Sequence, residues 1–179
     1  KGERIRDGLQ VVILGEPNIG KSTLLNFLSR RDVAIVSDIA GTTRDVLEVH
    51  LDISGFPVII VDTAGIRESG DVIEAEGIRR AESRAEKAGI KIIMVEAAAW
   101  PQMPERLSRR VDGDSIILLN KSDQAVLGDQ IPKPYGLDCI AILPVSAKQE
   151  EGTSEFLQLL SDEVEKRMEL TDTPNLTRG

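Results

Sequence analysis

The sequence predicts an α/β domain built on a mostly parallel sheet. Apolar runs of strand length recur along the chain, and the first is followed closely by a segment with the apolar spacing of a helix. Two of the runs, 47–53 and 56–61, are joined by a Ser-Gly turn and therefore form a hairpin, which makes one strand antiparallel. Polar motifs stand at the ends of other runs, where open α/β sheets bind their ligands.

Length and composition limit the classes of protein that the chain fits. Its 179 residues are enough for one well-buried domain, so we expect a single domain, 1–179, excised from a larger protein. The formal charge of −8 argues against a generic basic surface for nucleic acid. One cysteine, Cys139, excludes an internal disulfide and a cysteine-only zinc site. No apolar run approaches about 18 residues, so we predict a cytoplasmic protein without a membrane span.

The first strand leads into a loop that fits the pattern G-x-x-x-x-G-K-[ST]. The apolar run Val11–Leu14 precedes the loop Gly15–Ser22, and Thr23–Leu28 has the spacing of a helix. Glycines let the backbone curl around phosphate, and N–H groups at a helix N-terminus attract the anion. Lys21 then supplies a positive charge for the β- and γ-phosphates, and Ser22 offers a hydroxyl to Mg²⁺. The alternative is a glycine turn that caps an ordinary helix.

The segment after this helix combines a long connection with the hairpin. The connection 33–45 contains Gly-Thr-Thr-Arg-Asp, and loops of this length in compact domains are usually functional or disordered. The second hairpin strand delivers Asp62-Thr63-Ala64-Gly65 at its carboxyl end. A helix is predicted over about 73–87, closed by Gly89.

The second half of the chain contains three further runs of strand length, 90–95, 115–119 and 139–143. The middle run ends on Asn120-Lys121-Ser122-Asp123, and the last leads to Ser146-Ala147-Lys148. A short helix is predicted over 105–111. A last helix begins near Thr153, and the tail from Thr171, with Pro174, is predicted not to be helical. The buried side of that last helix is marked at i+4 steps by Phe156, Leu160, Val164 and Met168.

Two sets of oxygen atoms point to a guanine nucleotide with magnesium. The Asp123 carboxylate can accept two hydrogen bonds from N1 and the exocyclic amine of guanine, and adenine offers no such pair. Hydroxyls of Ser22 and Thr43, with Asp62 through water, form a sufficient set for Mg²⁺. Alternatively, Asp62 caps a strand and Asn-Lys-x-Asp is a surface turn. The position of that motif after a strand and a phosphate loop favours the functional interpretation.

Taken together, the motifs resemble those of a known class. They are, in chain order, Gly15–Ser22, Thr42-Thr43, Asp62–Gly65, Asn120–Asp123 and Ser146–Lys148. The chain resembles a translation-factor-type GTPase domain, and more closely the G domain of the MnmE (TrmE) family of bacterial tRNA-modification GTPases. The closer resemblance rests on Gly15–Asn26, Asp38–Leu47, Asp62–Glu68, Glu74 and Gly77. It implies a three-layer P-loop GTPase fold, with a mostly parallel six-stranded sheet, one antiparallel strand and helices on both faces.

The resemblance also implies roles for individual residues in binding GTP or GDP. Asn120 supports the phosphate loop and meets N7, the Lys121 stem covers the base, and the Ala147 backbone contacts O6. The Gly65 N–H binds the γ-phosphate. The complete implied set is Asn18, Ile19, Gly20, Lys21, Ser22, Thr23, Asp62, Gly65, Asn120, Lys121, Asp123, Ser146, Ala147 and Lys148.

Catalysis requires a group that orients water, and the usual glutamine is missing. Ile66 stands where Ras-like proteins keep it. The resemblance places the water-orienting carboxylate at Glu74, which acts with Gly65 and Thr43. Alternatively, Glu74 is one of several carboxylates on a solvated helix start.

A potassium ion, by resemblance, takes the place of an arginine finger. The residue that indicates this ion is Asn18 in the phosphate loop, and the coordination shell of the ion is completed around Ser37, Ile39 and Thr42. Backbone carbonyls can replace the hydration shell of K⁺. The alternative is that Asn18 merely favours the turn of the loop.

Partners also follow from the resemblance. They are a second copy bound through the switch face in the GTP or transition state, an FAD-dependent subunit contacted by the full-length protein, and tRNA indirectly, without a membrane. The runner-up is a ribosome-assembly GTPase of the Era or Der type. Asp123 disfavours an ATP kinase, and the presence of Lys21, Ser22, Thr43 and Asp62 disfavours a hydrolysis-dead scaffold.

Overall fold

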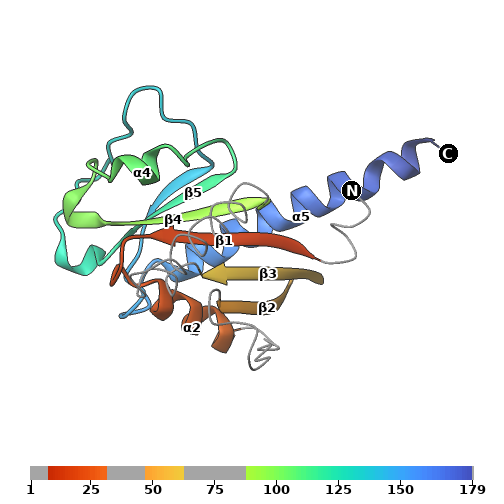
Figure 1. Ribbon diagram of the computed structural model, residues 1–179, viewed down its shortest axis with the longest axis horizontal. Coiled ribbons are helices and arrows are strands. Elements are labelled where there is room, and N and C mark those ends of the chain that lie inside the picture. Colours follow the sequence, from red (N-terminus) through yellow and green to blue (C-terminus); the bar gives the residue numbers. More distant parts are fainter. Residues whose placement is uncertain (1–7, 32–46, 63–87, 179) are drawn as a thin grey trace, which may run out of the picture.

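The computed structural model describes residues 8–31, 47–62 and 88–178, which form a six-stranded sheet with helices packed against it (Figure 1). In chain order the elements are β1 (Leu9–Gly15), α2 (Lys21–Arg31), β2 (Leu47–Ile53), β3 (Phe56–Asp62), β4 (Ile90–Glu96), the 3-10 helix η2 (Ala97–Ala99), α4 (Glu105–Ser108), β5 (Ser115–Asn120), the 3-10 helix η3 (Ser122–Gln124), β6 (Ala141–Pro144) and α5 (Thr153–Arg178). The predicted helix over 73–87 lies outside the described residues.

The sheet has one antiparallel strand at its edge. The strand order is β2-β3-β1-β4-β5-β6, and β2 pairs with β3 in antiparallel register while the other neighbours are parallel. Ser54 and Gly55 form the tight turn with φ of 56° and 85°, a conformation that hairpin turns of two residues require. The Gly55 N–H donates to Asp52 Oδ1 at 2.9 Å. The predicted hairpin and mixed sheet are confirmed.

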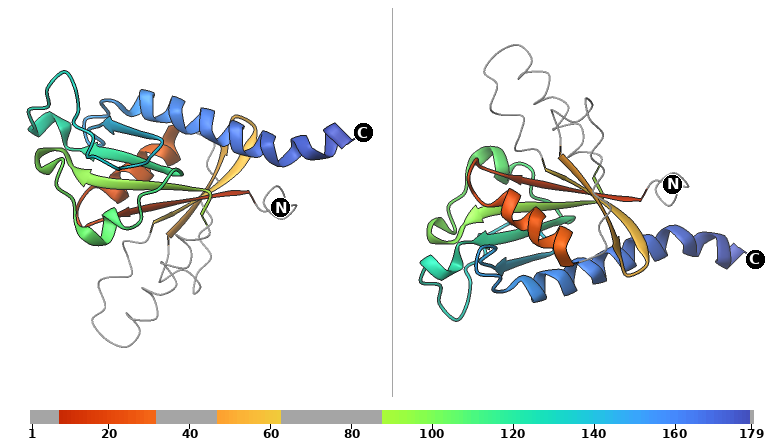
Figure 2. Two further views of the ribbon diagram at one scale, coloured as in Figure 1. Left: turned by 90° about the horizontal axis from the view of Figure 1, so that it is seen from above. Right: turned by 90° about the horizontal axis from the view of Figure 1, so that it is seen from below.

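Helices α2 and α5 cover one face of the sheet (Figure 2). Leu24 and Leu28 of α2 are fully buried in the main core cluster, as the predicted stripe requires. The i+4 stripe of α5 is buried in the same cluster and is therefore also confirmed; its members are Phe156, Leu160, Val164 and Met168.

The opposite face of the sheet carries a second core cluster. Trp100 and Leu107, from the end of η2 and from α4, pack there with Ile93 and Ile117 of the central strands. The Trp100 indole N–H donates to the Pro132 carbonyl at 2.7 Å and so anchors the loop before β6. Helices therefore lie on both faces, as predicted, and the architecture has three layers (Figure 2).

Arg167 attaches α5 to the amino-terminal edge of the sheet. Its Nη2 donates to Asp114 Oδ1 at 2.6 Å, and its Nε donates to the Gly89 carbonyl at 3.2 Å. Its Nη1 pairs with Glu163 one helical turn earlier. Asp114 and Gly89 stand directly before β5 and β4, so one guanidinium connects the helix to two strands.

The boundaries of three elements differ from those predicted. Helix α5 continues to Arg178, so the prediction of a non-helical tail was wrong; a proline removes one intrahelical N–H bond and can bend a helix without ending it. Helix α4 ends at Ser108 rather than near residue 111. Strand β6 starts at Ala141, two residues later than predicted, because it begins only where pairing with Ile116 of β5 begins.

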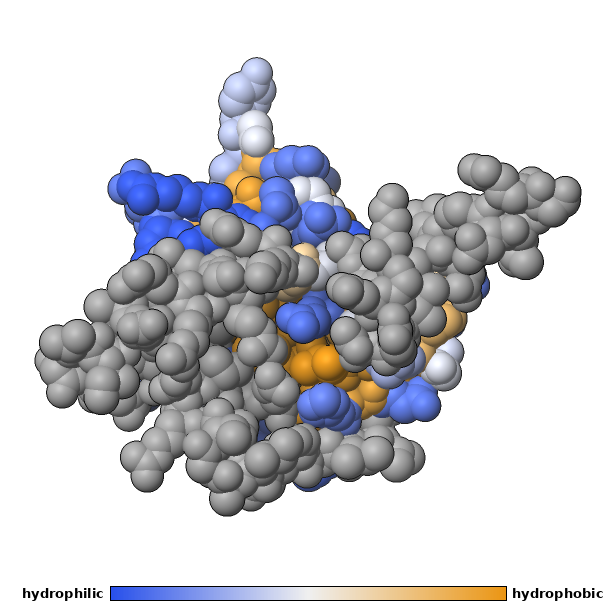
Figure 3. All heavy atoms as spheres, turned by 45° about the vertical axis from the view of Figure 1, so that its right-hand side comes forward, coloured by the Kyte–Doolittle hydropathy of each residue, from blue (hydrophilic) through white to orange (hydrophobic). Residues whose placement is uncertain are grey.

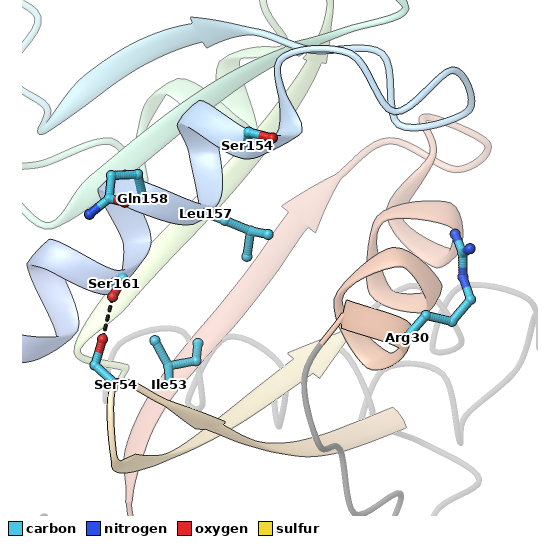
Figure 4. Close-up of a pocket in the computed structure, with 7 residues that line it drawn as sticks. All are labelled: Arg30, Ile53, Ser54, Ser154, Leu157, Gln158 and Ser161. Atoms are coloured by element: carbon cyan, nitrogen blue, oxygen red, sulfur yellow. Dashed lines mark hydrogen bonds between the residues drawn. The ribbon is translucent and has the colours of Figure 1, made fainter.

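The coloured part of the surface in Figure 3 shows hydrophilic side chains around a smaller apolar area. No helix in the described ranges combines the length and apolar character that a bilayer crossing needs. One pocket of about 610 Å³ lies between the end of α2, the β2–β3 turn and α5 (Figure 4). Arg30, Ser54 and Ser161 are among its lining residues, and the two serine hydroxyls are hydrogen-bonded. None of the predicted site residues lines it.

Candidate functional site

The predicted motifs, as far as they fall within the described residues, meet at the carboxyl-terminal edge of the sheet. Strand β1 ends at Gly15, β3 at Asp62 and β5 at Asn120, and β6 leads into Ser146 and Ala147. Because these strands are parallel, their carboxyl ends share one edge. The sheet order places β1 in the interior, so the loop after it lies between the polar ends of its neighbours.

Two positions in the loop Gly15–Ser22 have a backbone conformation with positive φ. Asn18 has φ of 66° and Gly20 of 113°. A Cβ atom on Gly20 would lie 2.3 Å from Nδ2 of Asn120, so this glycine is required by a close approach as well as by its backbone. The Leu24 N–H donates to the Gly20 carbonyl at 3.0 Å, which starts α2 directly after the loop.

Lys21 is buried inside this loop and is only 3% exposed. Its Nζ donates to the carbonyl of Gly15 at 2.7 Å and to that of Glu16 at 2.8 Å. These bonds hold an ammonium group against the backbone curl that would receive phosphate. A buried cation beside a helix N-terminus is suited to binding a polyanion.

Asn120 joins the phosphate loop to the loop after β6. Its Nδ2 donates to the Ile19 carbonyl at 2.6 Å, and its Oδ1 accepts from the Ala147 N–H at 3.0 Å. The side chain is 3% exposed, so both bonds lie in a region where losing them would leave buried polar groups without partners. The expectation that Asn120 supports the phosphate loop agrees with this geometry.

The segment after Asn120 forms a tight turn that exposes the predicted guanine ligand. Lys121 has φ of 62°, in the left-handed region, and η3 follows it directly. The Ser122 N–H donates to the Val145 carbonyl at 3.0 Å, which fixes this turn to the end of β6. Asp123 is exposed, as a carboxylate that has to reach a ligand requires.

Ser146 and Ala147 are buried in the loop that leads to α5. The backbone of Ser146 forms a two-way bridge with Glu151, and its hydroxyl accepts from the Gln149 N–H at 3.3 Å. Lys148 projects from the same loop and is exposed. The loop is therefore closed on itself before the helix begins.

A pocket of about 350 Å³ lies on the outer side of the phosphate loop. The loop and the end of β4 form two of its walls, and α4 forms a third. The Arg106 guanidinium pairs with the Glu16 carboxylate at 2.9 Å and connects α4 to the loop. Its apolar lining includes Pro17, Ile19, Met94, Val95, Ala99, Pro104 and Leu107.

The donor atoms present fit the chemistry of Mg²⁺. Asp62 is buried at the end of β3, while Ser22 and Thr23 are exposed in the first turn of α2. One carboxylate with hydroxyls suits Mg²⁺, which keeps several waters and substrate oxygens in its shell. Within the described ranges no group of three or more His, Cys, Asp or Glu could hold a metal ion.

Six predicted site residues lie outside the described residues. They are Ser37, Ile39, Thr42, Thr43, Gly65 and Glu74.

The structure adds one residue that the sequence reasoning missed. Glu96 ends β4, and its Oε2 accepts from Lys121 Nζ at 3.1 Å. A partial signal was present in the sequence, since Glu96 is a charged residue at the carboxyl end of an apolar run. Its position beside Asn120 comes from the register of β4 and β5.

The mixed sheet, the glycine loop with its buried lysine and the turn bearing Asp123 define the class as P-loop nucleotide-binding proteins. The family model described as "50S ribosome-binding GTPase" matches residues 10–121. The chain belongs to this family of GTPases.

Curated relatives are similar over almost the whole chain. The chain is 48% identical over 179 residues to "tRNA modification GTPase MnmE" of Wolbachia sp. subsp. Drosophila simulans (strain wRi). The aligned region covers 99% of this chain and 39% of the relative. It is 44% identical over 177 residues to the protein of the same name from Paramagnetospirillum magneticum, with coverage of 99% and 39%. The resemblance predicted from the motifs is confirmed, and the chain spans about two fifths of the length of these relatives.

Solved structures share the fold. A crystal structure of an Aquifex aeolicus Era variant bound to GDP.AlF4- has a TM-score of 0.60 at 26% identity, covering 86% of this chain and 56% of that one. The FeoB G-domain from Methanococcus jannaschii has a TM-score of 0.57 at 24% identity, covering 88% and 98%. The predicted P-loop GTPase fold is confirmed.

Proposed function

We propose that the chain is the G domain, 1–179, of a tRNA-modification GTPase, in which GTP binding and hydrolysis drive a conformational change. The names of relatives that are 44–48% identical support the biological process. The main support for a nucleotide site is the pair of buried hydrogen bonds of Asn120, which connect the phosphate loop to the proposed base-binding segments. The cytoplasmic location expected from the sequence stays a prediction.

The described residues bind GTP through three kinds of contact. The phosphate loop and the N-terminus of α2 receive the phosphates, and Lys21 adds its charge. The exposed Asp123 carboxylate selects guanine by accepting two hydrogen bonds. The Lys121 stem covers the base, and the Ala147 backbone, fixed by Asn120, contacts O6.

Ser22 and Asp62 would hold Mg²⁺ together with Thr43. When bound, the ion neutralises charge on the β- and γ-phosphates. Asp62 acts from the end of β3, and Ser22 from the first turn of α2.

Hydrolysis depends on residues outside the described ranges. Glu74 orients the attacking water, and the Gly65 N–H and Thr43 hold the γ-phosphate side of the site. Because no arginine finger is assigned, we propose that K⁺ supplies the positive charge beside Asn18, with Ser37, Ile39 and Thr42 completing its shell. Asn18 is exposed, so its side chain is accessible to an ion. Its left-handed φ of 66° is equally what the turn alternative requires.

Three partners are proposed, and one of them depends on the nucleotide state. The switch face pairs with a second copy in the GTP or transition state, the full-length protein contacts an FAD-dependent subunit, and tRNA is reached indirectly.

One assay tests hydrolysis, potassium and Glu74 together. GTP turnover is measured in K⁺ and in Na⁺ for the wild type and for Glu74→Ala. We expect turnover in K⁺ to exceed that in Na⁺ for the wild type. We expect Glu74→Ala to lose GTP turnover while retaining GDP binding. Equal turnover in the two salts would sink the potassium assignment.

Light scattering tests dimerisation. With GDP, aluminium fluoride and K⁺ the protein is expected to double its mass. A mass that stays monomeric under these conditions contradicts the dimer.

A second function, in ribosome assembly, is favoured by the "50S ribosome-binding" description of the matching family and by the likeness to Era. Sedimentation with purified 50S subunits in the GTP state separates the two functions. We expect no cosedimentation, and saturable binding would reverse the preference.

A further inference from the structure

We propose that Glu96 is a positioning residue for the guanine base and acts through Lys121. The inference rests on the proposed function, in which the Lys121 stem covers the base. Glu96 is the last residue of β4 and lies beside Asn120 in the parallel register of β4 and β5. Lys121 follows Asn120 in the chain, and its Nζ donates to Glu96 Oε2 at 3.1 Å.

The backbone of Lys121 is fixed before its side chain is considered. Its φ of 62° is a conformation that residues other than glycine rarely adopt, and such residues gather at functional sites. The Ser122 N–H donates to the Val145 carbonyl and the Gln124 N–H to the Lys121 carbonyl. The side chain therefore leaves from a rigid turn, and its remaining freedom lies in its own torsions.

Glu96 removes much of that remaining freedom. A lysine stem that packs on a ligand loses rotamer entropy, and ordering it before the ligand arrives reduces that loss on binding. The ion pair holds the ammonium group toward the end of β4, at the rim of the pocket on the outer side of the phosphate loop. The apolar stem is then available to the base while the charged end stays solvated.

The competing explanation is an ordinary surface ion pair. The side chains of Lys121 and Glu96 are 37% and 49% exposed, and pairs of this kind contribute little to folding stability. The two explanations therefore differ in what they predict. A positioning role changes nucleotide affinity through Lys121 and leaves stability unchanged, whereas a surface pair changes neither.

The test is a double-mutant cycle on GDP binding and GTP turnover. Kd for GDP, KM and kcat are measured for the wild type, Glu96→Gln, Lys121→Met and the double variant, with urea unfolding of each. We expect Glu96→Gln to raise Kd and KM about two- to five-fold, the range of one exposed charge pair, with kcat unchanged. In the Lys121→Met background, which keeps the stem and removes the charge, the same change has no further effect.

Glu105→Gln is the matched control, because it removes the carboxylate from another exposed pair, with Arg109 on α4. It is expected to leave Kd and KM at wild-type values. Equal GDP affinity for the wild type and Glu96→Gln would overturn the inference, and so would an equal loss in the Lys121→Met background. A wild type that binds ADP as tightly as GDP overturns the proposed function itself, which is a separate result.

Discussion

The two edges of the sheet are held by different kinds of polar contact. At the carboxyl edge the central group is Asn120, a neutral amide whose two described partners are backbone atoms of Ile19 and Ala147. At the amino edge it is Arg167, a cation whose partners include the acidic side chains of Asp114 and Glu163. Both side chains are largely shielded, at 3% and 16% exposed.

The difference follows from what each edge has to do. A ligand with several phosphate charges needs loops of fixed shape, and a neutral amide fixes two loops without adding a charge of its own. The amino edge has to attach a helix to strand ends, for which a guanidinium with carboxylates gives strong, directional bonds. Substitutions at the first edge should therefore lower both stability and ligand affinity, and those at the second should lower stability and leave ligand affinity unchanged.

The largest expected effect is that of Asn120→Ala. The change leaves the Ile19 carbonyl and the Ala147 N–H buried without this partner, which costs about 2–5 kcal/mol of unfolding free energy. GDP affinity should fall at least about 100-fold because two binding loops lose their connection. Calorimetric titration with GDP and urea unfolding measure the two effects. Asn26→Ala, at an exposed position of α2, is the control and should change neither.

Gly20→Ala is expected to act through the same junction. Its new Cβ would overlap Asn120 Nδ2, and its φ is also unfavourable, so we expect a loss of about 1–3 kcal/mol together with weaker GDP binding. Gly55→Ala separates the two causes, because Gly55 has φ of 85° and no atom within 4 Å of the added Cβ. It should cost about 1 kcal/mol and leave GDP affinity intact. Equal GDP binding by both variants would contradict the close-approach argument.

Arg167→Met tests the other edge. It retains much of the apolar stem and removes the bonds to Asp114, Glu163 and the Gly89 carbonyl. We expect a loss of about 2 kcal/mol in unfolding free energy, with GDP affinity within two-fold of the wild type. Arg109→Met removes the exposed ion pair with Glu105 and should lower the unfolding free energy much less. A large loss of GDP affinity in Arg167→Met would break the division between the two edges.

The smallest expected effect concerns Asp112, also at the amino edge. Burial by itself raises its pKa, but hydrogen bonds from Lys91, the Asp114 N–H and Ser115, with the charge of Lys91, outweigh it and lower the pKa. Since the folded-state pKa is depressed, the stabilisation is present above the unfolded value and is lost as pH falls through the folded value. Unfolding measured between pH 6 and pH 2.5, roughly spanning the carboxylate range, should show a steeper acid loss for the wild type than for Asp112→Asn. Identical slopes would contradict this assignment.

Local patterns were enough to predict much of the fold. The loop Gly15–Ser22, the turn at Ser54-Gly55 and the i+4 stripe of α5 each depend on residues close in sequence, and each is confirmed. The meeting of the motifs at one edge followed from the rule for parallel strands.

Contacts between distant residues could not be predicted from the residues alone. Asn120 reaches Ile19 across 101 positions, and which backbone atoms it binds depends on the final packing of both loops. The bond from Lys121 to Glu96 required the register of β4 and β5. The continuation of α5 past Pro174 shows that a single breaker residue does not decide a boundary.

Helix α5 is longer than the strands it packs on. Its 26 residues span about 39 Å at the usual rise, whereas a seven-residue strand of the sheet spans about 23 Å. The helix therefore extends beyond the sheet, as Figure 1 shows. Among the side chains that the structure describes, Met168 is the last of α5 in the core cluster, so the ten residues after it extend about 15 Å beyond that contact. At that length, a change of roughly 10° in the helix direction would displace the tip by about 3 Å.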